Sequence, residues 1–137
     1  MLFTKASEYA LLSMIYIAKN GCECDITTIS KELKIPKSFL AKIFQNLAKD
    51  GILISQKGAK GGFLLVKKTS EISLKSIIQS AEKKDNLVFE CSKSRCDCPS
   101  NKGEFCQIWD VFSFLQNSVD NFLNNITLEN IIKKDFM

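Results

Sequence analysis

A basic, glycine-rich hairpin placed after an amphipathic helix is the feature that most restricts the fold of this chain. Ile52–Ser55 (ILIS) and Phe63–Val66 (FLLV) are short apolar runs joined by the segment QKGAKGG. Two such runs around a glycine-rich link predict a pair of β-strands. A nucleotide phosphate loop is also rich in glycine, but it ends in Gly-Lys-Ser or Gly-Lys-Thr and opens a helix. This segment does neither, so we expect a hairpin.

Two helices are predicted ahead of the amphipathic one. Residues Thr4–Lys19 are apolar around most of the helical circumference, with Thr4 suited to the N-cap and Gly21 just past the end. We therefore expect a central core helix. Residues Thr27–Leu33 (TTISKEL) form a short second helix.

The third predicted helix begins at Pro36 or Lys37, after the break KIP, and ends at Asp50 before Gly51. One face is apolar and carries Phe39, Leu40, Ile43, Phe44 and Leu47. The opposite face carries Ser38, Ala41, Lys42, Gln45 and Lys49. Small, amide and cationic side chains are what a helix needs to contact base edges and phosphates in a major groove. A solvated helix face has a similar composition, so the hairpin that follows decides in favour of DNA.

Charge is distributed unevenly between the two halves of the chain. Residues 1–68 hold 11 lysines and 5 acidic residues, a net charge of +6, whereas residues 69–137 have a net charge of −2. The basic half is the candidate polyanion binder. We predict a mainly α fold with a small β-hairpin wing. Residues 1–68 form a winged helix-turn-helix DNA-binding domain, and residues 69–137 supply a cysteine loop and a long C-terminal dimerisation helix.

The C-terminal region has an apolar stripe at alternating spacings of three and four residues. Its members are Ile108, Phe112, Leu115, Val119, Phe122, Leu123 and Ile126. Such spacing is typical of a helix that packs against a partner helix. The same stripe could also cover the core of its own chain in part. We expect a homodimer.

Four cysteines crowd the loop CSKSRCDCPSNKGEFC, at positions 91, 96, 98 and 106. Such a loop either closes by disulfides or holds a metal centre. No secretory leader is recognisable, and the longest apolar run, Ala10–Ala18, is too short to span a bilayer. We therefore expect a cytoplasmic protein with reduced thiols and no membrane partner. No role is assigned to Cys22 or Cys24.

An iron–sulfur cluster is the metal centre that we favour for this loop. Structural zinc sites favour paired Cys-x2-Cys knuckles, which the loop lacks, although a four-cysteine zinc site stays open. A thiol–disulfide switch also stays open, and in that case Arg95, next to Cys96, would favour a reactive thiol. Catalysis is not expected, because the chain has no histidine, no nucleophile elbow and no paired carboxylates. We accordingly expect no small-molecule substrate.

Several segments together resemble the Rrf family of winged-helix transcriptional regulators, in particular its iron–sulfur cluster-binding branch. These are LFTKASEYALLSMIYIA, IPKSFLAKIFQNLAKDGIL, SQKGAKGGFLL, the cysteine loop and CQIWDVFSFLQNSVDNFLNNITLENII. The resemblance implies a homodimeric repressor that binds a near-palindromic double-stranded operator. It also implies a 2Fe–2S or 4Fe–4S cluster that senses redox state, nitric oxide or iron–sulfur status. The cluster type, and whether the loaded or the free protein binds DNA, are left open.

The resemblance also indicates site residues. We expect DNA contacts from Thr4, Tyr9, Ser38, Ala41, Lys42, Gln45, Lys57, Lys60 and Gly61. The cluster ligands would include Cys91 and Cys106, with Cys96 or Cys98 between them, because the spacing departs from the family pattern. The fourth ligand is either Glu8, which precedes the tyrosine of the first helix, or the remaining loop cysteine. Histidine ligation is excluded because the chain has none.

Overall fold

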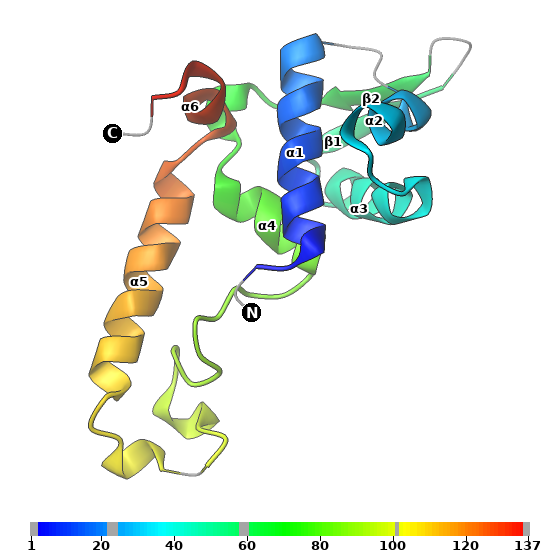
Figure 1. The fold of residues 1–137 in the computed structure, drawn as a ribbon. Coiled ribbons are helices and arrows are strands. Elements are labelled where there is room, and N and C mark those ends of the chain that lie inside the picture. The colour runs from blue at the N-terminus through cyan, green and yellow to red at the C-terminus, as the bar shows by residue number, and fades with distance from the viewer. Residues whose placement is uncertain (1–2, 22–24, 58–60, 101, 136–137) are drawn as a thin grey trace.

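Three helices and a hairpin make up the first half of the molecule (Figure 1). The computed structural model describes residues 3–21, 25–57, 61–100 and 102–135. The helices are α1 (Lys5–Asn20), α2 (Ile26–Leu33) and α3 (Lys37–Lys49). Strands β1 (Leu53–Gln56) and β2 (Gly62–Leu65) pair in antiparallel fashion, with Leu53 opposite Leu65 and Gln56 opposite Gly62. The predicted order of helices and strands is confirmed.

Capping residues explain where the first helices start and stop. The Thr4 side chain accepts a hydrogen bond from the Ala6 amide at 3.2 Å, and Gly21 has φ 71°, so both predicted ends of α1 are confirmed. Helix α2 begins one residue earlier than predicted. The reason is that Asp25 caps it, accepting from the Thr28 amide at 2.9 Å.

The hairpin is fixed to α3 through the apolar face of that helix. Leu40, Ile43, Phe44 and Leu47 are buried as predicted. The ring of Phe63 on β2 meets Phe44 edge to face, with the centroids 4.8 Å apart. Phe39 was placed on the same face, and this was wrong. Its ring is 42% exposed at the edge of the stripe and contacts Tyr9 of α1, with the centroids 5.3 Å apart.

The second half of the chain runs through the short 3-10 helix η1 (Thr69–Glu71) into α4 (Leu74–Glu82), and then through a long loop into α5 (Trp109–Asn125) and α6 (Leu128–Lys133). Two further 3-10 turns, η2 (Arg95–Asp97) and η3 (Gly103–Phe105), lie in the loop. The amide of Leu128 donates to the Ile72 carbonyl at 2.9 Å, which joins the C-terminal segment to the start of α4.

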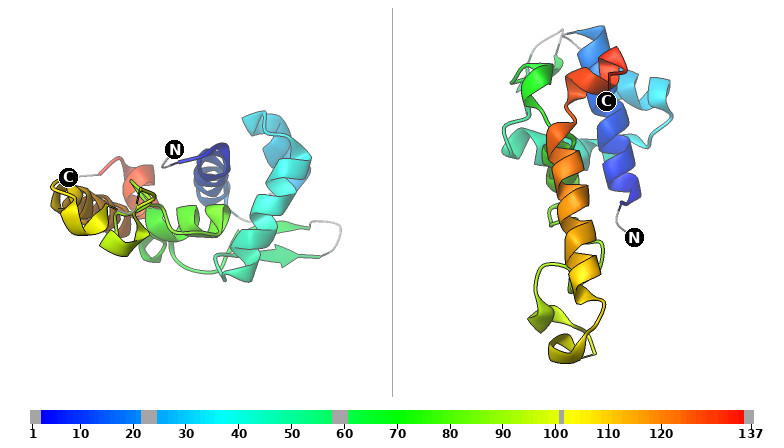
Figure 2. Two further views of the ribbon diagram at one scale, coloured as in Figure 1. Left: turned by 90° about the horizontal axis from the view of Figure 1, so that it is seen from below. Right: turned by 90° about the vertical axis from the view of Figure 1, so that its left-hand side faces the viewer.

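Helices α1 to α4, the hairpin and α6 pack into one head, whereas α5 and the 83–108 loop extend from it as an arm (Figure 2). The core of the head contains Ile72, Ile77, Ala81 and Leu128 beside residues of α1, α2 and α3. The head therefore takes part of its core from beyond residue 68. Within the described ranges, no helix is long and apolar enough to cross a membrane.

The apolar stripe predicted for the C-terminal helix is divided between two faces of α5. Leu123 and Ile126 are buried in the chain, and Phe112 stacks on Phe89 with the centroids 3.9 Å apart. Ile108, Leu115 and Phe122 are instead exposed, and two residues outside the predicted stripe, Val111 and Phe114, are exposed as well. The spacing identified the apolar positions but could not separate a face that covers the chain itself from one that is open.

Candidate DNA-contacting surface and cysteine loop

The exposed side of α3 carries the residues predicted to read DNA. Ser38, Ala41, Lys42 and Gln45 are all exposed, and Lys49 continues the same face. Helix α2 precedes α3 through a turn in which Lys34 adopts a left-handed conformation, with φ 55°. Since the opposite side of α3 is sealed into the core, this stripe is the part of the helix available to a major groove.

Of the two cations predicted for the wing, one lies in the described part of the chain. Lys57 is exposed at the end of β1, and Gly61 precedes β2. Lys60 lies outside the described residues, as do Cys22 and Cys24. A cation at the tip of a wing can reach phosphates or a minor groove that a recognition helix leaves uncontacted.

Thr4 and Tyr9, both predicted to contact DNA, take part in contacts within the chain. The Thr4 hydroxyl donates to Glu82 at the end of α4, and its amide donates to the same carboxylate at 3.3 Å. The Ser7 hydroxyl donates to this carboxylate at 2.6 Å. Tyr9 packs on Phe39 of α3. These two residues therefore link the start of α1 to α4 and to the recognition helix.

The hydrogen bonds from Ser7 and Thr4 favour the charged form of the Glu82 carboxylate. Partial burial opposes the charge, but the hydrogen bonds from Ser7 and Thr4 outweigh burial and hold the pKa of Glu82 below its ordinary value. Next to it, Lys83 pairs with Asp50 at the end of α3, with Nζ and Oδ2 3.0 Å apart. The end of α4 is thus fixed to both α1 and α3.

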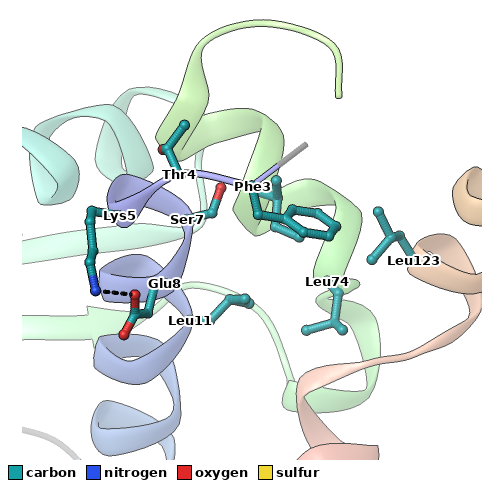
Figure 3. Close-up of a pocket in the computed structure, with 9 residues that line it drawn as sticks. Phe3, Thr4, Lys5, Ser7, Glu8, Leu11, Leu74 and Leu123 are labelled. Atoms are coloured by element: carbon teal, nitrogen blue, oxygen red, sulfur yellow. Dashed lines mark hydrogen bonds and ion pairs between the residues drawn. The ribbon is translucent and has the colours of Figure 1, made fainter. Parts of the chain in front are cut away.

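Glu8 stands at the rim of an apolar cavity of about 540 Å³ between α1, α4 and α5. Phe3, Leu11, Leu74, Ile78 and Leu123 supply most of the apolar lining (Figure 3). The Glu8 carboxylate pairs with Lys5 at 2.9 Å, and its side chain is 51% exposed. The 91–106 loop lies at the far end of α5, away from α1 (Figure 1). Glu8 and the cysteines of one chain are therefore not brought together.

The four loop cysteines differ in accessibility. Cys91 is buried, Cys96 is exposed, and Cys98 and Cys106 are half-buried. The backbone amide of Lys102 donates to the Cys98 sulfur at 3.4 Å. Among the described residues, no three cysteine, aspartate or glutamate side chains gather into a metal-binding group. The donor set nevertheless fits an iron–sulfur centre chemically, because such clusters are held by cysteine thiolates whose sulfurs accept hydrogen bonds.

Gln116, on the buried face of α5, holds the stem of the loop. Its side chain is 1% exposed, accepts from the Val88 amide at 2.7 Å and donates to the Asn86 carbonyl at 2.8 Å. Further along, the indole N–H of Trp109 donates to the Cys91 carbonyl at 2.7 Å. The chain is therefore attached to α5 at two places, at residues 86–88 ahead of the loop and at the backbone of Cys91.

Sequence reasoning did not find Glu82, Gln116 or the contacts of Trp109. A signal existed for two of them. Gln116 is a polar residue at a position where the apolar period of α5 demands burial, and Trp109 is the one tryptophan of the chain, three residues after Cys106. Glu82 carries no local signal, because its partners are more than 70 positions away in the sequence.

Comparisons with known proteins agree with this geometry. The family model described as Rrf2, iron-dependent transcriptional regulator, matches residues 3–134. The chain is 29% identical over 134 residues to the HTH-type transcriptional regulator IscR of Serratia proteamaculans, covering 96% of this chain and 79% of that relative.

Two solved structures are similar along 96% of both chains. CymR, the global cysteine regulator of B. subtilis, has a TM-score of 0.76 at 21% identity, a likeness of fold alone. The oxidized form of Staphylococcus aureus CymR has a TM-score of 0.71 at 25% identity. The predicted winged-helix fold is thereby confirmed.

Proposed function

Because this chain belongs to the Rrf2 family of transcriptional regulators, we propose that it is a homodimeric repressor whose binding to operator DNA is modulated by an iron–sulfur cluster in the 91–106 loop. Family membership makes it a DNA-binding regulator and not an enzyme. The observation that carries the finer proposal is the placement of the four-cysteine loop at one end of α5, whose other end is built into the DNA-binding head. Its work on DNA implies a cytoplasmic site of action.

DNA is contacted through α3 and the wing. Gln45 and Lys42 are proposed to reach the major groove, with Ser38 and Ala41 allowing close approach of the helix. Lys57, Lys60 and Gly61 are proposed to lie along the phosphates. Thr4 and Tyr9 act beside the DNA by fixing α1 against α4 and α3, a role supported by their contacts with Glu82 and Phe39. In this proposal, residues 1–68 serve DNA binding, and residues 69–137 serve the cysteine loop and dimerisation.

The dimer is proposed to form through the open face of α5. Ile108, Val111, Leu115 and Phe122 follow one another at spacings of three, four and seven residues and are each more than 40% exposed. A helix face of this kind packs against a symmetry-related helix in two-fold dimers. Because the same helix carries the cysteine loop at its start, dimer geometry and loop geometry are linked.

Cys91 and Cys106 are the proposed outer ligands, and Cys98 is preferred to Cys96 as the middle one. The Cys98 sulfur already accepts an amide hydrogen bond, and a bond of that kind stabilises a thiolate. The fourth ligand is either Cys96 or the partner's copy of Glu8. Glu8 faces a cavity at the edge of the head, where a partner's loop could approach.

A bound cluster would supply oxidation- and nitric oxide-sensitive bonds to these thiolates. The chain's own contribution is to transmit the resulting restraint on the loop. Gln116 and Trp109 hold the loop on α5, and the exposed face of α5 sets the angle between the two heads. A free-energy difference of about 1.4–3 kcal/mol between the two states would change operator affinity about tenfold to more than a hundredfold.

The test combines spectroscopy with DNA binding. Protein purified without oxygen should contain iron and sulfide and absorb visible light, and removing the iron should shift operator affinity at least tenfold in fluorescence anisotropy. Replacing Lys57 and Lys60 by alanine should lower the slope of log affinity against log salt by about two. Colourless protein with stoichiometric zinc would refute the cluster, and an unchanged salt slope would refute the wing contact.

A thiol switch is the second candidate. The observation in its favour is the exposed thiol of Cys96, together with the likeness to a regulator solved in an oxidized form. Under this scheme, iron-free protein should lose or gain operator affinity on treatment with peroxide and recover on reduction. A Cys96→Ser variant that still responds fully would exclude Cys96 as the switching thiol.

A further inference from the structure

Arg95, in η2, contacts three residues that lie in two other segments, η3 and the first turn of α5. Its guanidinium lies over the indole ring of Trp109, 4.7 Å from the centroid. Nη1 donates to the Gly103 carbonyl at 3.3 Å. Nη2 pairs with the Asp110 carboxylate at 3.2 Å. One side chain thus connects η2, η3 and the first turn of α5.

Two further contacts complete this arrangement. The indole that carries the guanidinium also donates to the Cys91 carbonyl, so the beginning of the loop is joined to the same group. Gly103 packs against the backbone of Arg95 so closely that a Cβ there would lie 2.0 Å from the Arg95 carbonyl oxygen. Only glycine allows η3 to approach η2 at this point.

The three contacts of Arg95 contribute unequally to the stability of the loop. The Asp110 carboxylate is 80% exposed, so its ion pair with Arg95 contributes little. The stack on Trp109 and the bond to the Gly103 carbonyl depend on the planar fork of a guanidinium, which a lysine cannot reproduce. The planar shape of the Arg95 guanidinium therefore contributes more to holding the loop than its charge does.

We propose that Arg95 is a positioning residue that keeps the 91–106 loop assembled in the absence of any metal. It joins the segments that carry Cys91, Cys96 and Cys106, so the thiols are held on a formed loop before a ligand arrives. This inference rests on the proposed function and deepens it. If the loop is already folded, a signal changes the bonds at its thiols and does not fold or unfold the loop.

The experiment uses full-length, reduced protein with a chelator present. Hydrogen exchange is followed by mass spectrometry in wild type, Arg95→Met and Lys93→Met. Lys93 is the matched control, since it is a loop cation paired with Asp85 at 3.0 Å but stacks on nothing in the part of the chain described. Amides bonded within the loop, such as those of Asp97 and Phe105, are the reporters.

Arg95→Met should speed exchange in the loop about tenfold, the factor expected from losing one stack and one carbonyl hydrogen bond. Helices α1 to α3 and the Lys93→Met variant should exchange as in wild type. Emission of Trp109, the only tryptophan, should become more accessible to acrylamide in Arg95→Met alone. Equal loop exchange in wild type and Arg95→Met would overturn the proposal.

Arg95→Lys separates geometry from charge. Fast exchange in this variant supports the stacked fork as the element that holds the loop, and wild-type exchange would overturn it in favour of simple attraction to Asp110. Failure of the cluster proposal has a different signature. In that case the purified wild type holds no iron, while the exchange difference between the metal-free wild type and Arg95→Met persists.

Discussion

Gln45 is an exposed amide in the middle of the exposed face of α3, one turn away from the exposed residues Ala41 and Lys42. An amide can bond two atoms of one adenine edge, whereas a lysine beside it mainly attracts phosphate. Replacing Lys42 and replacing Gln45 should therefore change DNA affinity in different ways.

Gln45→Ala should weaken binding to the operator by about 1–3 kcal/mol and leave binding to random duplex nearly unchanged. Lys42→Ala should weaken both by similar factors. Fluorescence anisotropy on the two duplexes measures the ratio, and Gln107→Ala, an exposed glutamine on the arm, serves as the control. Equal losses for Gln45→Ala on both duplexes would show that it makes no base contact.

The loop thiols allow a sharp distinction between ligand sets. Cys91→Ala and Cys106→Ala should abolish the visible absorption of anaerobic protein under either set. If Glu8 of the partner is the fourth ligand, Cys98→Ala should abolish absorption, Cys96→Ala should spare it, and Glu8→Ala should make the cluster labile. If the site is all thiolate, both middle cysteines should be required and Glu8→Ala should be silent. Glu32→Ala, on exposed α2, controls for loss of an acidic group.

Helix α5 has two apolar faces that differ in exposure. One face buries Leu123 and Ile126 in the chain. The other carries Leu115 and Phe122, which are 42% and 58% exposed. An exposed stripe of this length on a helix that extends from the head would expose apolar surface to water unless a partner covers it.

A charge on the open face should therefore separate the protomers. If the proposed dimer forms through this face, Phe122→Glu should be a monomer in analytical ultracentrifugation at micromolar protein concentration, with the helical circular dichroism kept. Asn124→Glu places the same charge at an exposed polar position of the same helix and should leave the dimer intact. A Phe122→Glu dimer as tight as wild type would place the interface elsewhere.

For the molecule as a whole, the carboxylate of Glu82 joins the first residues of the chain to the end of α4. Its pKa is held below the ordinary value of 4.5 by hydrogen bonds that outweigh the opposing effect of burial. A carboxylate with a lowered pKa stabilises the folded state above its unfolded pKa, and that stability is lost as pH falls through the folded pKa.

Glu82→Gln should lower the free energy of unfolding by about 1–2 kcal/mol at pH 7, because hydrogen bonds to a charged acceptor are stronger. The difference from wild type should shrink below about pH 4.5, the ordinary value of a glutamate. Urea denaturation at both pH values measures it. Asp25 and Asp85 also have lowered pKa values, so both proteins keep some acid sensitivity. If the difference in unfolding free energy between wild type and Glu82→Gln stayed constant with pH, the charge of Glu82 would not contribute to stability.

Local sequence patterns were enough to predict helices α1 to α3, the caps of α1 and the hairpin, but α4, α6 and the Asp25 cap of α2 were not predicted. Apolar periodicity, a capping threonine before α1 and glycines after α1 and α3 act within a few residues, so each can be recognised without knowing the rest of the fold. The exposed stripe of α3 followed from the same periodicity. Because the four cysteines of the loop are close in sequence, they could be recognised as a candidate site as well.

Which surfaces meet was decided only by tertiary packing. Phe39 turned out to lie against Tyr9 of another helix, and the stripe of α5 was split because α4 and the loop stem cover one side of it. The bonds of Glu82 to Thr4 and Ser7, and of Arg95 to Gly103 and Trp109, join residues that no short-range pattern relates. Periodicity fixes the side of a helix on which a residue lies, but its neighbour there depends on the path of the whole chain.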